Sequence, residues 1–532
     1  MEHHNTSLQQ EQGFTTSGSN ISYWLDSVEP IRFVPLTSNQ KTEVVVVGGG
    51  IAGLSVAYCL VKAGKQVIVV EDGFIGSGES GRTTAHLVNA LDDRYAEIER
   101  LLGSEKCLLA AESHTEAINF IERVAREEKI DCDFQRLDGF LFLHPTDKHE
   151  TIDEEFVTTN KHGIRTEKIQ GVPGMAGETG VCLRFPDQAQ FHPLKYMKGL
   201  ADIIVRNGGS IYTETHIEDI AKTGVRSKEF VIDAEHIVVA TNTPINNWVT
   251  MHTKQFPYRT YVIGGLVPKN SIRPGLWWDT GNMKSEWVTE PYHYVRLQPY
   301  NESHDLLIAG GEDHKTGQSE KEHLEEQQRY GKLERWVRRQ FPSMTEIVYH
   351  WSGQVMEPVD MMAFIGKNPG DRNIYIATGD SGNGMTHGTI AGMLISDLIL
   401  GKKNPWENLY DPSRITLKAT SDFLKEVGNM GMQYLDYFES GDIRSLSELK
   451  PRHGGIVTMN RKKVALYKDE SEVLHAFSAI CPHMGCILHW NGDEHSFDCP
   501  CHGSRFTCQG VVVNGPAKDN MQRLYLRKKV ES

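Results

Sequence analysis

The sequence predicts an α/β (α+β) domain that combines a parallel sheet with a separate antiparallel sheet, followed by a small all-β domain. An apolar strand pattern at 44–47 runs into a glycine turn and an apolar helix pattern, and residues 292–297 alternate like a strand with two different faces. Near the C-terminus, short strand patterns flank two loops rich in Cys and His. The expected divisions are an N-terminal tail and lead-in (1–40), a large α/β domain (41–412), a helical linker (413–452) and a small β domain (453–532).

Composition narrows the class of protein. The chain has 532 residues, of which 39% are hydrophobic and 24% are charged, as is typical of a globular protein with two or three domains. A formal net charge of −14 disfavours a nucleic-acid partner, because phosphate binding needs a basic face.

Residues 1 to about 20 are polar and are expected to form a mobile tail. In the linker, apolar residues between 423 and 438 recur at three and four, which predicts a helix packed on the large domain.

Three features favour a cytoplasmic location. No apolar run reaches the length of a membrane span, and the N-terminus lacks the charged and apolar pattern of a signal peptide. Of the nine cysteines, five lie between residues 481 and 508 and the other four are scattered. Scattered thiols are typical of a reducing compartment.

The first strong motif is a strand, a glycine turn and a helix. The strand at 44–47 is followed by Gly48, Gly50 and Gly53 in the pattern G-x-G-x-x-G. These glycines allow a tight turn, so that a pyrophosphate can lie at the helix N-terminus, where free N–H groups and the helix dipole favour an anion. A second apolar strand ends at Glu71, where a carboxylate would accept a hydrogen bond from a ribose hydroxyl. The pattern predicts a Rossmann-like parallel sheet that binds a dinucleotide.

Two later segments distinguish FAD from NAD. Residues 78–86 follow the second strand, and residues 374–388 form another strand, glycine loop and helix start. A helix N-terminus there can stabilise negative charge on a reduced flavin. With the glycine motif, these segments resemble the D-amino-acid oxidase superfamily, also called the glycine oxidase or sarcosine oxidase group. The resemblance implies FAD contacts, besides the glycines and Glu71, at Arg82, Thr83, Thr84, Ile217, Ala240, Gly379, Gly382, Gly384, Met385 and Thr386.

Two further expectations concern whether the FAD is covalently attached and what it exchanges electrons with. Some relatives attach FAD covalently to a His or Cys near this loop, and the spacing at His86 differs from the covalent pattern by one residue, which leaves covalent attachment as the less favoured alternative. No second G-x-G-x-x-G follows a strand, so a separate nicotinamide domain is not expected. The FAD is therefore expected to exchange electrons with a small-molecule substrate directly.

The middle of the chain, roughly 181–206 and 258–307, is expected to form the antiparallel sheet that covers the flavin. Tyr292, Tyr294 and Arg296 share one face of a strand. Members of the resembled family commonly bind a substrate carboxylate with an Arg near this place, which makes Arg296 the candidate anchor, with Tyr294 beside it. The alternative is an Arg that is solvated or salt-bridged. Nearby aromatic residues are expected in the core rather than the pocket: Trp277, Trp278, Tyr258 and Tyr261.

The second strong motif lies in the last fifty residues. It consists of two strings, Cys481-Pro-His483-Met-Gly-Cys486 and Cys499-Pro-Cys501-His502-Gly-Ser504. Each string offers one sulfur and one imidazole from a tight loop, as in a Rieske iron–sulfur site, where two Cys bind one iron and two His bind the other. The spacing gives Cys481, His483, Cys499 and His502 as ligands of a 2Fe–2S cluster. Zinc is the alternative, but a zinc site has no use for the extra cysteines or for Gly503-Ser504.

The strings resemble the Rieske proteins of respiratory cytochrome bc complexes. That resemblance implies a disulfide between Cys486 and Cys501, paired strands within 454–469, and a covering proline loop at 514–517. Where those proteins carry a Tyr that donates to a cluster sulfur, this chain has Phe506. Loss of that hydrogen bond is expected to lower the reduction potential.

The whole chain resembles bacterial proteins in which such an FAD domain is fused to a C-terminal Rieske domain. The resemblance favours a dehydrogenase of an amine or amino-acid-like substrate that transfers a hydride to FAD, from which electrons pass singly through the cluster to an external one-electron carrier. One alternative reverses the current, with a ferredoxin-like donor reducing the cluster and then FAD for substrate reduction or oxygenation. Another is a redox relay or sensor without a substrate. A Rieske oxygenase is disfavoured, because only 30 residues follow His502.

Overall fold

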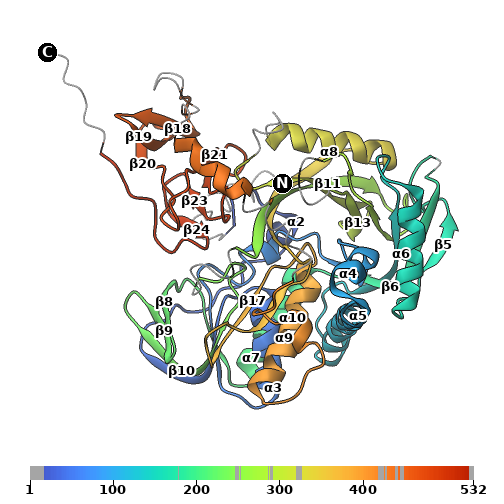
Figure 1. Ribbon diagram of the computed structural model, residues 1–532, viewed down its shortest axis with the longest axis horizontal. Helices are drawn as coiled ribbons and strands as arrows, with labels where there is room; N and C mark the ends of the chain where they lie inside the picture. Colours follow the sequence, from blue (N-terminus) through green and yellow to red (C-terminus); the bar gives the residue numbers. More distant parts are fainter. Residues whose placement is uncertain are drawn as a thin grey trace.

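The computed structural model describes a large domain with two sheets and a smaller C-terminal domain packed against it (Figure 1). The described residues are 17–525 except 178, 246–250, 252, 286, 288–290, 319–325, 417–424, 426–427, 438–440, 442 and 444–448. Residues 1–16 of the predicted tail lie outside them, as do 423–424, 426–427 and 438 of the predicted linker helix. Residues 428–432 are helical, as expected, but the linker contacts both domains rather than the large domain alone: Asn429 accepts from Gln318, whereas Tyr434 and Tyr437 donate to Met484 and Gly485. The sheets confirm the predicted fold class.

The first sheet is the predicted Rossmann-like one. Its strand order is β16-β17-β10-β1-β2-β7, with β9 beside β10 and β8 beside β9. The strands β7, β2, β1, β10 and β17 run parallel, and β16 is antiparallel to β17. Their bounds are β1 (Gln40–Val47), β2 (Val67–Val70), β7 (Ser210–Tyr212), β8 (Ile217–Ala221), β9 (Gly224–Ser227), β10 (Val231–Val239), β16 (Phe364–Lys367) and β17 (Ile374–Thr378).

Two helices that follow the glycine loops pack on this sheet at close range. They are α3 (Ile51–Lys62) and α9 (Gly384–Ile399). A Cβ added to Gly388 would lie 2.6 Å from the Ile51 side chain, and one added to Gly392 would lie 2.6 Å from the Ser55 side chain. Glycines in α9 therefore let the two helices cross in contact, which brings both helix N-termini to the same edge of the sheet (Figure 1).

The second sheet is mixed, with β12 parallel to β4 and its other pairs antiparallel. The order is β15-β11-β14-β13-β12-β4-β6-β3, with β5 beside β6. The bounds are β3 (His86–Leu87), β4 (Gln135–Phe142), β5 (Glu167–Gln170), β6 (Val181–Gln190), β11 (Gln255–Pro268), β12 (Leu276–Asp279), β13 (Tyr294–Pro299), β14 (His304–Lys315) and β15 (Ile347–Pro358). The expectation of sheet throughout 181–206 is wrong beyond residue 190, because Pro193 starts helix α7 (Pro193–Arg206), whose apolar residues recur at helical spacing.

Of the remaining helices, the short α2 lies in the interior of the molecule with Tyr23, Trp24 and Leu25 buried, and the others pack around the large domain (Figure 1). Of these, α8 packs on β11 and β14, α5 packs on α9, and α4 packs on α5 and α6. The bounds are α2 (Tyr23–Ser27), α4 (Tyr95–Leu102), α5 (Ser104–Glu127), α6 (His149–Lys161), α8 (Glu326–Gln340) and α10 (Glu407–Tyr410). Within the described residues, no helix is both long and apolar enough to cross a membrane.

The C-terminal domain is all-β, as predicted. One sheet contains β18 (His453–Met459), β19 (Lys462–Lys468) and β20 (Leu474–Ser478), and the hairpin of β18 and β19 matches the paired strands expected within 454–469. The other contains β21 (His489–Asn491), β22 (Ser496–Asp498), β23 (Arg505–Thr507) and β24 (Val512–Asn514). The two Cys and His loops lie beside the second sheet: residues 481–486 precede β21, and residues 499–504 connect β22 with β23.

The expectation of a mobile tail does not hold for residues 17–20. The backbone N–H groups of Ser19 and Asn20 donate to Glu494 of the C-terminal domain, at 2.6 and 3.0 Å. The Asn20 side chain donates to Asp493 at 2.6 Å. Polar composition suggested a solvated tail, but here the polar groups pair with carboxylates from the distant end of the chain, the buried Glu494 and the half-buried Asp493.

Candidate functional site

A cavity of about 330 Å³ lies where the two sheets and the C-terminal domain meet. The β1–α3 glycine turn and the start of α9 line one part of it, and side chains of the second sheet line another. Residues 512–515, 517 and 518, which include most of the predicted proline loop, contribute from the C-terminal domain. The dinucleotide motif and the iron–sulfur domain therefore border the same space.

The glycine turn has the shape that a pyrophosphate requires. Gly48 has φ +110°, and a Cβ there would lie 2.3 Å from the carbonyl oxygen of Ala240. A Cβ on Gly53 would lie 1.9 Å from the carbonyl oxygen of Gly48. Gly48 and Gly50 line the cavity, whereas Gly53 lies behind the turn and keeps α3 close to it. The turn fits FAD, because bare backbone faces the cavity at the start of α3.

Glu71 lies at the end of β2 and lines the cavity, as expected for a ribose-binding carboxylate. Its Oε2 accepts from the N–H of Gly49 at 2.6 Å, and its Oε1 accepts from the N–H of Gly73 at 2.9 Å. Burial raises the pKa of Glu71, and these backbone donors act against that rise. The carboxylate is thus held in one orientation beside the glycine turn.

Most of the other expected FAD contacts also lie around the cavity. Its lining includes Arg82, Thr83, Thr84, Ile217, Ala240, Gly382, Gly384 and Met385. Gly379 and Thr386 are not part of the lining. The Thr386 hydroxyl instead lies 2.9 Å from His114 Nδ1, inside the helix layer. His86 lines the cavity with both ring nitrogens engaged, one with Thr84 and one with the Val295 carbonyl.

The structure corrects the expected role of Arg296. Its guanidinium is fully buried below the cavity and is not part of the lining. It donates to the carbonyl oxygens of Ala85 (2.8 Å), Phe191 (3.0 Å) and Thr84 (3.2 Å), and also to Gln298. Because Arg296 is 0% exposed, lies outside the lining, and uses its two terminal nitrogens on backbone carbonyls and on Gln298, it does not face a substrate carboxylate in the cavity. We therefore assign it a structural role that fixes the loop carrying Thr84.

Tyr294 does line the cavity, in a wall of aromatic and acidic side chains. Its hydroxyl lies 2.6 Å from the Thr260 hydroxyl. Next to it, the Tyr292 hydroxyl donates to Asp92 Oδ2 at 2.6 Å. The same lining includes Trp278, which also belongs to the buried core, as expected. The acidic members of the wall are Asp92, Asp313, Glu357 and Asp380.

Burial raises the pKa of each of these carboxyl groups. The pKa of Asp92 rises to about 8, that of Asp313 to about 7 and that of Asp380 to about 6, while that of Glu357 rises well above its usual range. Neighbouring carboxylates contribute to the rise at Asp92 and Glu357. A cation in the cavity would favour their charged forms. Except for Asp380, which belongs to the expected glycine loop, sequence reasoning missed these residues, because they come from distant segments without a local motif.

The two Cys and His loops bring the four predicted ligands together. The thiols of Cys481 and Cys499 contact each other, and this contact lowers the pKa of Cys481. The rings of His483 and His502 have centroids 4.9 Å apart and lie nearly perpendicular. Burial lowers the pKa of His502 to about 3, which keeps it neutral as a ligand must be. Two sulfurs on one side and two imidazoles on the other fit a Rieske 2Fe–2S cluster.

The remaining two cysteines of the strings, Cys486 and Cys501, form the disulfide that the resemblance implied. The sulfurs of Cys486, Cys499 and Cys501 lie within 4.8 Å of one another, but the disulfide removes two of them as metal ligands. This arrangement disfavours a zinc site built on three thiolates.

The cluster loop at 499–504 packs against the strand that also lines the cavity. Gln354 of β15 donates from Nε2 to the carbonyl oxygen of Gly503 at 3.0 Å. Gln354 is itself part of the cavity lining. On the neighbouring strand β11, Pro257 lies against Gly503, where an added Cβ would come within 2.6 Å of the Pro257 Cβ. The loop that carries His502 is therefore packed directly against a strand that lines the cavity.

Replacement of Phe506 by tyrosine is expected to raise the reduction potential of the cluster. Phe506 lies on β23 and is 0% exposed in the core of the C-terminal domain. A hydroxyl that donates to a cluster sulfur would favour the reduced, more negative state, with an upward shift on the order of 50 mV. Redox titration followed by electron paramagnetic resonance measures it. Phe477→Tyr, in the same core but on β20, is the control, and an equal shift in both variants would contradict the argument.

This geometry defines a class of protein. A dinucleotide cavity with flavin-type loops and a two-cysteine, two-histidine cluster site adjoin each other in one chain. The comparisons agree with it: residues 43–398 match the family FAD dependent oxidoreductase, and residues 441–525 match the Rieske [2Fe-2S] domain. The chain belongs to the FAD dependent oxidoreductase family and carries a C-terminal Rieske domain, with FAD and a 2Fe–2S cluster as its cofactors.

Similar proteins match either nearly the whole chain or mainly its large domain. A Bacillus subtilis protein, YhfW, named as a Rieske 2Fe-2S iron-sulfur protein, is 31% identical over 95% of this chain and 97% of its own length. The gamma-glutamylputrescine oxidoreductase of Escherichia coli is 28% identical over 69% of this chain and 86% of its own. L-proline dehydrogenase from P. horikoshii matches in structure with a TM-score of 0.56 at 20% identity, over 71% of this chain and 98% of its own. The likeness to L-proline dehydrogenase shows a shared fold alone.

Proposed function

We propose that this protein dehydrogenates an amine or amino-acid-like substrate and passes the electrons singly through the Rieske cluster to an external one-electron carrier. The observation that carries the proposal is the shared cavity, bordered by the FAD turn, by the acidic and aromatic wall, and by the Rieske domain. When bound, FAD accepts two electrons from the substrate, and the cluster passes electrons one at a time. We place this activity in the cytoplasm, on the argument from the scattered thiols.

The character of the cavity wall favours an amine over an amino acid. An ammonium group is attracted by carboxylates such as Asp92 and Asp313 and by the faces of the rings of Tyr292 and Tyr294. The obvious guanidinium for a carboxylate, Arg296, is bonded to backbone carbonyls. Arg82 lines the cavity, but its terminal nitrogens pair with Glu494, Ser352 and Asn20. Beside the wall that contains Asp92 and Asp313, a substrate carboxylate would therefore face acidic groups.

The same wall can prepare the amine for oxidation. An amine that enters as an ammonium ion must lose a proton before its lone pair can assist removal of hydrogen from the adjacent carbon. Asp92, with a pKa of about 8, is able to take that proton at Oδ1 or Oδ2, and the Tyr292 hydroxyl holds the carboxylate in place. Burial of the wall excludes water, which strengthens the attraction between the ammonium ion and the carboxylates.

Anaerobic stopped-flow mixing tests the proposed function. Oxidised protein is mixed with amines and with the matching amino acids, and the flavin and cluster absorbances are followed separately. We expect amines to bleach the flavin first and the cluster second. A cluster that is reduced first by a ferredoxin, followed by the flavin, would establish the reverse current instead. No bleaching with any compound or donor would favour a relay without a substrate.

Substitution of Asp92 is expected to remove a pH-dependent step. Because the pKa of Asp92 is raised to about 8, its carboxyl is neutral below that pH and charged above it. The value of kcat/KM for an amine should rise roughly tenfold per pH unit up to about pH 8 and then level off. Asp92→Asn should lose this rise. Asp305→Asn, on β14 but paired with Lys269 at the surface, is the control, and an unchanged profile in Asp92→Asn would refute the assignment.

A further inference from the structure

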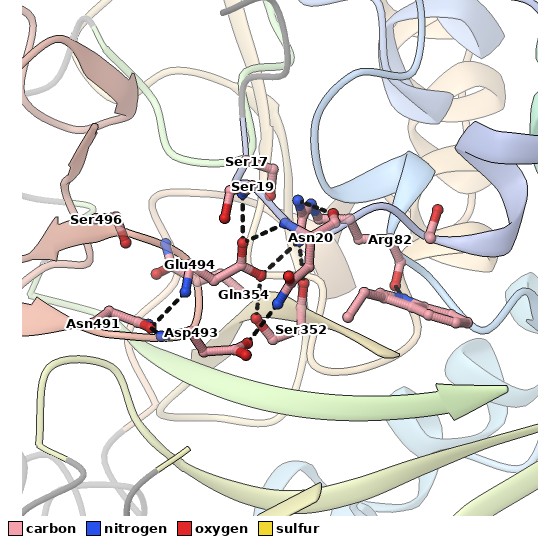
Figure 2. A network of polar contacts seen from close by, with 12 residues as sticks. Ser17, Ser19, Asn20, Arg82, Ser352, Gln354, Asn491, Asp493, Glu494 and Ser496 are labelled. Carbon is pink, nitrogen blue, oxygen red and sulfur yellow. Dashed lines mark hydrogen bonds and ion pairs between the residues drawn. The ribbon is translucent and has the colours of Figure 1, made fainter. Parts of the chain in front are cut away.

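A buried ion pair joins the Rieske domain to the loop that lines the flavin cavity (Figure 2). Glu494 lies in the turn between β21 and β22, and its Oε1 accepts from Arg82 NH1 at 2.8 Å. The side chains of both residues are 0% exposed. Ser352 of β15 donates to the same Oε1 at 2.5 Å, while Oε2 accepts from the backbone N–H groups of Ser19 and Asn20. Oε1 is thus engaged by the large domain and Oε2 by the N-terminal lead-in.

Arg82 connects this pair with the cavity. Its guanidinium also donates to the carbonyl oxygens of Ser352 (2.8 Å) and Asn20 (2.6 Å). Its own carbonyl accepts from the indole of Trp351 at 2.8 Å. Arg82 itself lines the cavity, and Thr83 and Thr84, which follow it, do so as well. The contacts that fix Arg82 therefore also fix the loop of Arg82, Thr83 and Thr84 beside the cavity.

Glu494 connects the pair with the cluster. The turn that carries it leads through β22 directly to Cys499, five positions further along the chain. Asn491 holds the base of the turn, since its side-chain oxygen accepts from the N–H of Glu494 at 3.0 Å. Any shift of Glu494 would move β22 and with it the loop that contains Cys499 and His502.

A buried ion pair is a poor source of net stability, because desolvation offsets most of the attraction, but it can specify one arrangement. Burial by itself would raise the pKa of Glu494, yet the charges of Arg82, Arg259 and Arg505 lower it to about 2. The carboxylate is thus ionised across the physiological range. A charged group that is buried in this way finds its partners in only one arrangement of the Rieske domain on the large domain.

We propose that Arg82 and Glu494 are positioning residues that hold the Rieske cluster against the flavin cavity, so that electrons pass between the two sites within one chain. The inference rests on the proposed function in so far as electrons move between the sites. Neither residue acts on the substrate. Their effect is on the distance and orientation of the two sites, to which rates of reaction between positioned groups are sensitive.

The test compares Glu494→Gln with Glu470→Gln in holoenzyme that carries both cofactors. Glu470 also pairs with an arginine, Arg452 at 2.7 Å, but the pair is exposed and lies within the Rieske domain. After flash photoreduction of the flavin, the appearance of the electron on the cluster is timed. We expect a rate lower by roughly tenfold or more in Glu494→Gln, with unchanged cluster potential and spectrum, and a wild-type rate in Glu470→Gln.

Hydrogen exchange gives a second readout that does not depend on turnover. The β21–β22 hairpin should exchange faster in Glu494→Gln than in the wild type. Glu494→Asp, which keeps the charge, should restore part of both the rate and the protection, and it replaces Glu494→Gln if that variant does not fold. A wild-type transfer rate in Glu494→Gln would overturn the proposal. If the wild type passes no electron between the sites, the proposed function fails, and equal protection of the hairpin would then overturn the positioning role separately.

Discussion

Replacement of Gly53 by alanine is expected to abolish retention of FAD. The new methyl carbon would lie 1.9 Å from the carbonyl oxygen of Gly48, far inside van der Waals contact. That oxygen belongs to a residue at φ +110°, whose other side is packed against Ala240, so the turn cannot move aside without losing its shape. Overpacking of this kind costs about 1–3 kcal/mol or more, and it falls on the turn that receives the pyrophosphate.

The ratio of flavin to protein absorbance in the purified variant measures this effect, and the resonance signal of the cluster reports whether the Rieske domain remains intact. Gly331→Ala in α8 is the matched control, because its Cβ would meet only the end of the Arg335 side chain at 3.4 Å. That variant should keep its FAD and gain up to about 1 kcal/mol of helix stability. Normal FAD content in Gly53→Ala would show that the turn is not the cradle.

Removal of the disulfide should destabilise the Rieske domain by about 3 kcal/mol. Cys486 and Cys501 are 15 positions apart, and a cross-link over such a loop restricts the unfolded chain by about that amount. The bridge also joins the two loops that carry the cluster ligands. The double variant Cys486→Ala/Cys501→Ala should therefore lose cluster absorbance at a lower denaturant concentration than the wild type.

Urea titration of the cluster absorbance tests this expectation, with the flavin absorbance followed in the same sample. Cys508→Ala is the control, because Cys508 lies in the same domain but is neither a predicted ligand nor bridged. Equal midpoints for the double variant, the control and the wild type would mean that the bridge does not support the cluster loops.

The parts of the site that the sequence predicts are those with short spacing. The glycine turn and the Cys and His strings each lie within a few residues, so that local geometry alone brings their groups together. The structural role of Arg296 could not be predicted from short spacing. The alternating strand placed it correctly on one face with Tyr294, but the carbonyls of Ala85 and Phe191 that occupy its guanidinium come from other segments.

The acidic wall and the interdomain pair illustrate the same limit. Asp92 and Asp313 are separated by more than two hundred positions, and each resembles an ordinary surface residue in its local sequence. Glu494 lies in a turn where a solvated carboxylate would be unremarkable. Only the tertiary packing of both domains places these charges in the interior, where burial changes their chemistry.

The contact of residues 17–20 with the turn around Glu494 has a consequence for how the two domains depend on the chain between them. Segments from both ends of the sequence interlock at one boundary, together with β15 from the middle. The linker takes part in the same boundary, because Gln318 of the large domain donates to Asn429 at 2.9 Å, and Tyr434 and Tyr437 donate to the carbonyl oxygens of Met484 and Gly485 in the first cluster loop. Persistence of the docked state therefore depends on the linker contacts as well as on the segments from the two ends of the chain. A chain that begins at residue 21 would retain every described strand of both domains and every predicted cluster ligand. It would nevertheless leave Glu494 Oε2 without its two backbone donors. The loss of a segment at the N-terminus would therefore weaken the boundary with the C-terminal domain.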